Sequence, residues 1–188
     1  MKIVFKVNPP CAPRFEFMDS KQPQIHSLKY KITKLLSLPD EFLLNIRGVY
    51  SEVLLERIRS VHYPNLPSRL SAVFVFENLQ YAKRFKFSGW IEKECTIYAY
   101  NIENLYSPPF CADMCLTNVL SNVRMNWERF KNKKSSFIKS TLGESLEFIC
   151  HSYWQGKTSK DLGLGDGDSL PEILLNAYLK PISFIPLS

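Results

Sequence analysis

Residues 59–85 contain the side chains that are best suited to bind a phosphorylated ligand. Arg69 carries five N–H donors in a planar fork, a geometry that matches the oxygens of a pyrophosphate and that lysine cannot reproduce. Ser68 and Ser71 offer hydroxyl groups close to it, and His62 offers a ring nitrogen that can form a hydrogen bond. This combination makes the stretch the first candidate for a ligand site.

The segment that carries these side chains is predicted to be a stiff polar turn that enters a buried strand. Pro64 and Pro67 fix two φ angles and keep the residues before them out of the helical region. Residues 72–76 are continuously apolar, β-branched or aromatic, which is typical of a strand covered on both faces. Asn78 is then placed to cap a helix over residues 79–85. Binding residues are often carried by such loops on a rigid scaffold.

Each of these side chains also has a structural alternative. Arg69 would serve in a surface or interface salt bridge, and Ser68 and Ser71 would close local turns. His62, at the end of a predicted helix, would act as a cap or bond to a neighbouring group. The sequence leaves both alternatives open for every one of them.

The order of these pieces resembles that of bacterial and phage domains with the ADP-ribosyltransferase-like fold. The matching pieces are His62-Tyr63-Pro64, Pro67-Ser68-Arg69, the strand after them, Glu77-Asn78-Leu79-x-Tyr81-Ala82-Lys83-x-Phe85, Tyr153-Trp154-Gln155-Gly156 and Pro171-Glu172-Ile173-Leu174-Leu175. Together with the first strand they cover residues 59–188, and residues 8–51 are not accounted for. The resemblance implies an α+β domain in which two small β-sheets form a cleft with helices around it.

The resemblance also implies an activity, the transfer of ADP-ribose from NAD to a macromolecular acceptor by a toxin, an effector or a phage–host conflict protein. In that family a glutamate on a late strand contacts the nicotinamide ribose and stabilises the positive charge that develops as the glycosidic bond breaks. Glu172 matches this glutamate. A fixed carboxylate acts far more strongly in a dry pocket than in water. The alternative for Glu172 is an ordinary surface glutamate.

The same resemblance implies which residues contact NAD, which is consumed as a substrate. The set is Lys6, His62, Ser68, Arg69, Ser71, Tyr153 and Trp154. Tyr153 and Trp154 would wall the nicotinamide side of the pocket or else pack in the core. Two positions depart from the family pattern. Lys6 stands where such enzymes usually have arginine or histidine, and Leu170 stands where a glutamate or glutamine used in modifying arginine is expected.

A positive cluster lies on the long helix that is predicted to begin at Asp113 and just beyond it. The cluster consists of Arg124, Arg129, Lys131, Lys133 and Lys134. We expect it to bind an anionic acceptor, which would be RNA, DNA or an acidic protein. A solvated helix end is the alternative, because lysine near a helix C-terminus also suits the helix dipole. Two other functions stay open, a non-catalytic interaction protein on the same fold and a basic nucleic-acid-binding module.

The composition is that of one globular domain over residues 1–188, because 45% of the residues are hydrophobic and 22% are charged. A net charge of +6 favours anionic partners without choosing among them. No apolar run approaches the length of a membrane span and the N-terminus lacks the apolar core of a secretory signal, so we expect a cytoplasmic protein without a membrane partner. Five cysteines without a second pair at metal-ligand spacing favour reduced thiols and no metal site.

Hydrophobic periodicity predicts the elements that position these residues. Residues 2–7 alternate as a strand, with Lys6 on one face and the other face formed by Ile3, Phe5 and Val7. Residues 51–61 predict a helix with one apolar stripe, formed by Val53, Leu54, Ile58 and Val61. The side of this helix that is expected to face water carries Glu52, Glu56, Arg57 and Arg59.

The rest of the chain predicts an alternation of helices and strands. Helices are expected over residues 25–36, 41–46 and 142–154 and from residue 113 onwards. Strands are expected over residues 95–102, 171–176 and 180–185. A glycine-rich loop over residues 156–167 separates the last helix from the two closing strands.

Overall fold

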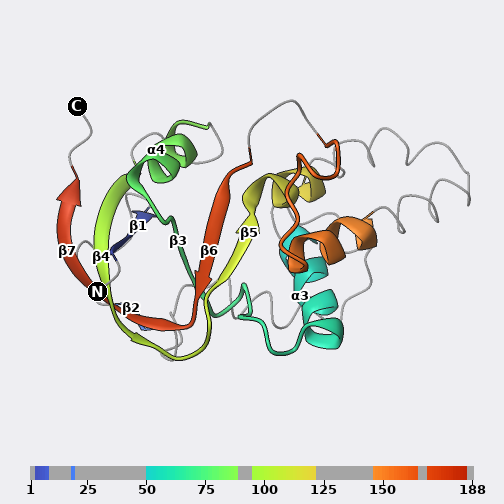
Figure 1. Cartoon of the computed structure of the whole chain (residues 1–188), viewed down its shortest axis with the longest axis horizontal. Coiled ribbons are helices and arrows are strands. Elements are labelled where there is room, and N and C mark those ends of the chain that lie inside the picture. The colour runs from blue at the N-terminus through green and yellow to red at the C-terminus, as the bar shows by residue number, and fades with distance from the viewer. Residues whose placement is uncertain are drawn as a thin grey trace, which may run out of the picture. The chain divides into compact units, whose positions relative to one another are not determined.

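The computed structural model describes residues 3–8, 18–19, 50–88, 95–121, 146–164 and 169–185 (Figure 1). The helices predicted over residues 25–36 and 41–46 lie outside this part of the chain. The chain divides into two compact units. Unit 1 consists of Met1–Gln24, Ser71–Cys111 and Leu170–Ser188, and unit 2 consists of Ile25–Leu70 and Ala112–Ser169. The single domain expected for residues 1–188 stays a prediction.

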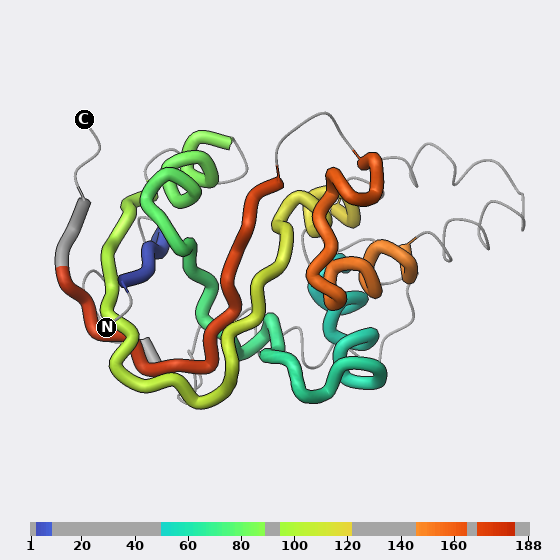
Figure 2. The backbone as a smooth tube through the Cα atoms, viewed as in Figure 1, coloured from blue at the N-terminus to red at the C-terminus, as the bar shows by residue number. Residues whose placement is uncertain are grey.

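Unit 1 contains a four-stranded sheet in the order β1-β4-β7-β2, in which neighbouring strands are antiparallel. Its strands are β1 (Ile3–Asn8), β4 (Thr96–Leu105), β7 (Ala177–Ile185) and β2 (Met18–Asp19). The register between β4 and β7 shifts after Ala99 and again after Ile102. Such irregularities increase the local bend of a strand, and Figure 2 shows β4 as a long curved segment.

The second sheet has three strands in the order β3-β6-β5. These strands are β3 (Val73–Val75), β6 (Pro171–Leu175) and β5 (Phe110–Asp113). β3 and β6 are antiparallel, with Val73 opposite Leu175 and Val75 opposite Ile173. Figure 2 shows that β6 runs directly into β7, so the chain passes from this sheet to the four-stranded one at Asn176. The structure confirms an α+β fold with two small antiparallel sheets.

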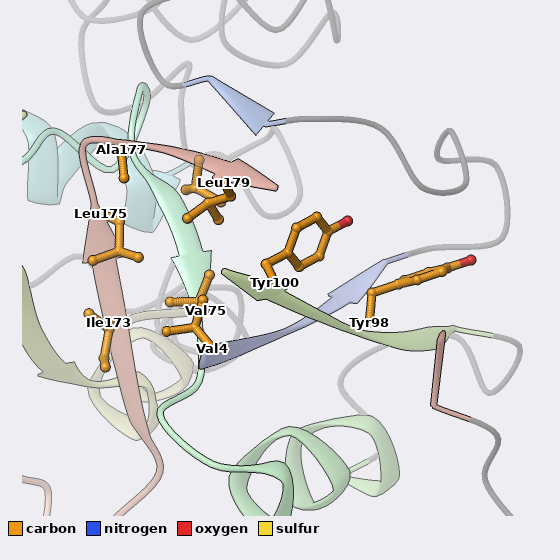
Figure 3. Packing of buried hydrophobic residues seen from close by; sticks show 9 residues of the cluster. Val4, Val75, Tyr98, Tyr100, Ile173, Leu175, Ala177 and Leu179 are labelled. Carbon is orange, nitrogen blue, oxygen red and sulfur yellow. The ribbon is translucent and has the colours of Figure 1, made fainter. Parts of the chain in front are cut away.

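One apolar cluster lies between the two sheets of unit 1 (Figure 3). From the four-stranded sheet it takes Val4, Tyr98, Tyr100, Ala177 and Leu179, and from the other sheet it takes Val73, Val75, Ile173 and Leu175. Because residues two apart in a strand share a face, one face of β3 and one face of β6 enter this core together. The short apolar runs in these strands, residues 73–75 and 173–175, match a position that is covered on both faces.

The first strand faces the core with the side that carries Lys6. Val4 and Asn8 are buried, whereas Ile3 is 49% exposed. Alternation places Lys6 on the same face as Val4 and Asn8 and opposite to Ile3, Phe5 and Val7. Both faces of this strand are partly covered, and an apolar count along the sequence cannot tell which of the two meets the core.

Helix α4 (Leu79–Phe87) follows β3 as predicted. Asn78 is its N-cap, because its side chain accepts a hydrogen bond of 2.9 Å from the backbone N–H of Tyr81. Ala82 is fully buried and Gln80 and Lys83 are exposed, so the helix has one buried side.

Helix α3 (Tyr50–His62) of unit 2 forms where expected, but it buries a different face. Val61 is 72% exposed, whereas Leu55 is fully buried and Glu56 is buried as well. The predicted stripe is therefore wrong at Val61, and Glu56 does not face water. Hydrogen bonds to Glu56, described below, compensate for its removal from water, and a pattern of apolar residues does not contain this information.

Two further helical segments of unit 2 confirm predictions. Residues 114–121 begin after Asp113, whose side chain accepts hydrogen bonds from the N–H groups of Cys115 and Ser159 at 3.0 and 2.7 Å. Residues 146–154 belong to the helix expected over residues 142–154, and they carry a buried stripe formed by Leu146, Ile149, Cys150 and Tyr153. Within the described ranges, no helix is both long and apolar enough to cross a membrane.

Candidate functional site

The strands β1, β3 and β6 of unit 1 lie side by side, and each contains a predicted site residue or comes shortly after one. β1 and the end of β3 exchange two backbone hydrogen bonds between Phe5 and Phe76, at 2.9 and 2.7 Å. β3 pairs along its length with β6. Lys6 belongs to β1, Ser71 lies in the turn before β3, and Glu172 belongs to β6. These segments are far apart in the sequence, and the backbone pairing brings them together.

Lys6 is a half-buried cation on the core face of β1, opposite Tyr98 of β4 in the strand register. Desolvation by burial lowers the pKa of its ammonium group from 10.5 to about 8. A buried cation that keeps its charge is costly, and such side chains are concentrated at functional sites. Burial thus perturbs the cation that was predicted to bind the cofactor in unit 1.

Glu172 and Ser71 lie at opposite ends of the β3–β6 pair. Ile173 pairs with Val75, so Glu172 is at the level of Phe76, while Ser71 precedes the other end of β3. At about 3.3 Å per residue, β3 and Phe76 span about 10 Å, and Ser71 lies two residues before β3. Only an extended ligand can contact both residues. Glu172 is 1% exposed, and alternation places it on the face of β6 opposite to Ile173.

A pocket with a volume of about 370 Å³ lies next to these strands within unit 1. Its lining residues are Val4, Glu77, Ile102, Leu105, Pro109, Cys111 and Ile173. The walls are mostly apolar, and both sheets contribute to them. This size and this mostly apolar lining are within the range of small-molecule sites. Glu77 is the one carboxylate of the lining, and it begins one of the matching pieces of the resemblance, where no role was predicted for it.

In unit 2, Arg69 forms a buried network of its own. Its Nε and one Nη group donate to the two carboxylate oxygens of Glu52, both at 2.8 Å. Its other Nη group donates to the hydroxyl of Tyr153, and the guanidinium carbon lies 5.2 Å from the centre of that ring. The fork that the sequence assigned to a pyrophosphate thus binds a carboxylate of the protein, which matches the salt-bridge alternative.

The same region holds the proline-rich loop against α3. Arg59 donates to both oxygens of Glu56 and, through Nη1, to the backbone carbonyls of Pro64 and Leu66, both at 3.1 Å. Ser68 donates its hydroxyl hydrogen to Glu56 at 2.9 Å. The polar turn is therefore fixed by one carboxylate and one guanidinium, in addition to its two prolines.

Tyr153 and Trp154 are both buried in unit 2, with their rings edge to face at 4.9 Å between centroids. The indole N–H of Trp154 donates to the carbonyl of Leu55 at 2.9 Å. Both side chains therefore contribute to the packing between the 146–154 helix and α3, which is the core role left open by the sequence.

His62, the remaining residue of unit 2 that was predicted to contact NAD, is exposed at the end of α3. The centre of its ring lies 4.9 Å from the centre of the His151 ring. His62, Ser68, Arg69, Tyr153 and Trp154 belong to unit 2, whereas Lys6, Ser71 and Glu172 belong to unit 1. The predicted acceptor-binding residues Arg124, Arg129, Lys131, Lys133 and Lys134 lie outside the described residues.

The described part of the chain contains no group of three or more His, Cys, Asp or Glu residues that could hold a metal ion. Burial, together with the charge of Glu147, raises the pKa of the Cys150 thiol to about 12, so this thiol stays neutral and unreactive.

Sequence reasoning missed Glu52, Glu56 and His151 as members of polar networks. One signal was available: Glu52, Glu56 and Arg59 recur at spacings of three and four, which places them on neighbouring positions of one helix surface. Their partners Ser68 and Arg69 follow two prolines. No comparable signal in the sequence connects His151 to Tyr63.

The fold and these sites define an α+β protein with two small antiparallel sheets, a pocket in unit 1 and buried ion pairs in unit 2. A family model described as "Protein of unknown function (DUF2441)" matches residues 16–176. The match spans most of the chain, so the chain belongs to this family. No curated protein matches the chain.

Replacement of Lys6 by methionine tests whether this cation is held at a cost. Below pH 8 both the folded and the unfolded chain bind the proton, so the full penalty of burying the charge acts on the native protein. We expect Lys6→Met to raise the free energy of unfolding by about 1–3 kcal/mol at pH 7.

The stability gained by Lys6→Met should shrink as the pH rises from 8 to 10.5. In this range Lys6 of the folded protein has lost its proton, whereas the lysine of the unfolded chain still holds it. Urea unfolding of both proteins across this pH range measures the difference between their free energies of unfolding. Groups other than Lys6 titrate in both proteins, so their contributions cancel in this difference. A difference that is independent of pH would contradict the lowered pKa.

Arg69→Lys tests whether the arginine is structural. Lysine carries its donors on one nitrogen and cannot reproduce the two-point bond to Glu52 while it also reaches Tyr153. A partly unpaired carboxylate remains, so we expect a loss of about 2–4 kcal/mol in the free energy of unfolding. Tyr153→Phe, the control, removes only one hydroxyl partner and should cost about 1 kcal/mol. Urea unfolding measures both. Unchanged stability of Arg69→Lys, combined with a loss of NAD binding, would instead assign the arginine to the ligand.

Proposed function

We propose that this protein is an NAD-dependent ADP-ribosyltransferase that transfers ADP-ribose to an anionic macromolecular acceptor. One observation supports this most strongly: β1, β3 and β6, the strands to which the resemblance assigns the first-strand cation, the turn serine and the glutamate, are neighbours in unit 1. Their residues are Lys6, Ser71 and Glu172. Three separate motif segments of the resemblance thus meet in one small region.

Lys6 and Glu172 have chemical roles in the proposed reaction. Lys6 binds a phosphate of NAD as a point charge, a role for which arginine would give a fork. Glu172 stabilises the positive charge on the ribose as nicotinamide leaves. Because Ser71 and Glu172 lie at opposite ends of the β3–β6 pair, a ligand that contacts both must be extended, as a dinucleotide is.

The apolar pocket of unit 1 suits the flat nicotinamide ring. Val4 of its lining is two residues from Lys6 on the same face of β1, whereas Glu172 lies on the face of β6 opposite to Ile173 of the lining. Glu77 would favour the positive charge that this ring carries in NAD. Glu77 is therefore a second candidate for the carboxylate of the reaction, and the experiment below separates it from Glu172.

The pyrophosphate role of Arg69 is given up in this proposal, because the donors of Arg69 serve Glu52 and Tyr153 within unit 2. The acceptor is expected at the cluster from Arg124 to Lys134, and an action as a cytoplasmic toxin, effector or phage–host conflict protein belongs to the same proposal.

A second function, a non-catalytic interaction protein on the same fold, is favoured by the burial of Glu172. A carboxylate that is 1% exposed cannot touch a ligand until a covering segment moves. The lysine at position 6 points the same way, because a lysine in place of arginine or histidine is what loss of an ancestral site would leave.

Labelled NAD incubated with the protein and a cell extract tests the proposal. We expect transfer of label to macromolecules together with release of nicotinamide. Glu172→Gln should abolish both while NAD still binds in calorimetry, because the substitution removes the charge and keeps the shape. Glu77→Gln is measured in parallel, and Glu103→Gln, an exposed position on β4, is the matched control and should behave as the parent protein.

The outcomes separate the candidates. Full labelling by Glu172→Gln and loss of labelling by Glu77→Gln would move the catalytic role to Glu77. Full labelling by both variants would contradict the proposed mechanism. Absence of NAD binding and of nicotinamide release in the parent protein would leave the interaction protein as the function. Thermal unfolding of each variant shows that any loss of activity is not a loss of fold.

A further inference from the structure

A surface at the end of α3 in unit 2 has binding chemistry that the proposed NAD reaction does not use. We call it the ring surface, and it consists of His62, Tyr63, Phe148, His151, Gln155 and Lys157. It combines aromatic or imidazole rings with amide and ammonium donors. Most of its members are exposed, and Tyr63 and His151 are half-buried.

The rings at the centre of this surface are held in place by each other. Tyr63 Oη and His151 Nδ1 share a hydrogen bond of 3.0 Å, and Gln155 Nε2 donates to the same hydroxyl at 3.4 Å. The rings of His62 and His151 meet edge to face at 4.9 Å, and the rings of Tyr63 and His151 at 5.7 Å. A ligand would meet a preformed set of rings, so little ordering is required on binding.

Phe148 extends the surface along the 146–154 helix. It is spaced three residues before His151 and seven before Gln155, and these intervals place the three side chains on one face of the helix. The side chain of Phe148 is a large apolar ring, yet the residue is 55% exposed. A single exposed apolar ring is ordinary on a protein surface, so Phe148 matters here because it continues the face that carries His151 and Gln155.

The end of the helix brings a cation to this ring. Gly156 has a φ of 71°, which turns the chain back so that the N–H groups of Gly156 and Lys157 bond to the carbonyls of Tyr153 and Ser152. The ammonium group of Lys157 then lies 6.0 Å from the centre of the Phe148 ring. Ring and cation are thus paired by the geometry of the helix end.

From these features we infer that the ring surface binds single-stranded nucleic acid. Flat rings stack on unpaired bases whatever their sequence, while a lysine beside them neutralises a phosphate. The amide of Gln155 and the imidazole nitrogens can form hydrogen bonds to base edges. A duplex hides the faces of its bases, so it offers the rings nothing to stack on. The net charge of +6 attracts the strand from a distance.

One charge in the region opposes this binding. Glu147 is exposed, and its Oε1 lies 3.9 Å from Nε2 of His151. Its carboxylate repels the phosphates of a bound strand, so its removal should strengthen binding. The sign of this effect distinguishes nucleic acid from a cationic partner, for which the carboxylate would help.

Unit 1 contains a matched control. Phe87 at the end of α4 is 70% exposed and has the ammonium of Lys86 at 5.8 Å from its ring centre, but no histidine cluster is described beside it. Phe87→Ala therefore removes the same kind of exposed ring and cation pair as Phe148→Ala. The two variants differ only in which surface they alter.

Fluorescence anisotropy with labelled oligouridylate and oligothymidylate of about 12 nucleotides, in the absence of NAD, measures binding. We expect Phe148→Ala to weaken binding of the single strand at least about fivefold and Phe87→Ala to leave it unchanged. Lys157→Gln should make the fall of log K, the association constant, with log salt concentration less steep by about 0.7. Glu147→Gln should strengthen binding about twofold. A duplex of the same length should bind more weakly than the single strand.

Three results would overturn the inference. These are the absence of binding to either oligonucleotide, equal loss of affinity in Phe148→Ala and Phe87→Ala, and equal affinity for single strand and duplex. Because NAD is not present, none of these results bears on the proposed transferase activity. Circular dichroism of the variants checks their fold, which should be intact because both phenylalanines are exposed.

Discussion

The apolar cluster between the two sheets of unit 1 is the constraint on which the proposed site depends. The chain changes sheets where β6 continues into β7 at Asn176, so neighbouring residues such as Leu175 and Ala177 pack in one core from two sheets. This core fixes the registers of β3 and β6, because a shift by one residue would turn the apolar face of either strand outward. The neighbourhood of β1, β3 and β6 follows from that burial, as Figure 3 illustrates.

The buried charges of the two units differ in how the loss of water is compensated. In unit 2, Arg59 and Arg69 each pair with a carboxylate of α3, and the pairing compensates for removing these groups from water. In unit 1, burial lowers the pKa of Lys6. A residue that is costly where it lies marks a position where function and stability compete, and for this reason Lys6 carries more weight in the functional proposal than the better-paired Arg69.

Much of the fold could be predicted from the sequence, because strands such as β3 and β6 and the cap at Asn78 are encoded by local patterns. The buried side of α3 could not, since it depends on Glu56 finding partners twelve residues later in Ser68 and close by in Arg59. The pocket at Glu77 was missed for the same reason, as its walls come from segments that only the fold brings together. For Arg69, residue type alone did not separate a phosphate ligand from a salt bridge.

Amide hydrogen exchange with and without saturating NAD tests the central claim, that NAD binds unit 1 beside β1, β3 and β6, most directly. The proposal predicts slower exchange with NAD in peptides that cover residues 3–8, 71–77 and 171–176. Peptides of α3 in unit 2, where the arginines serve the protein's own carboxylates, should exchange at an unchanged rate. Protection confined to α3, or no change in the three segments of unit 1, would contradict it.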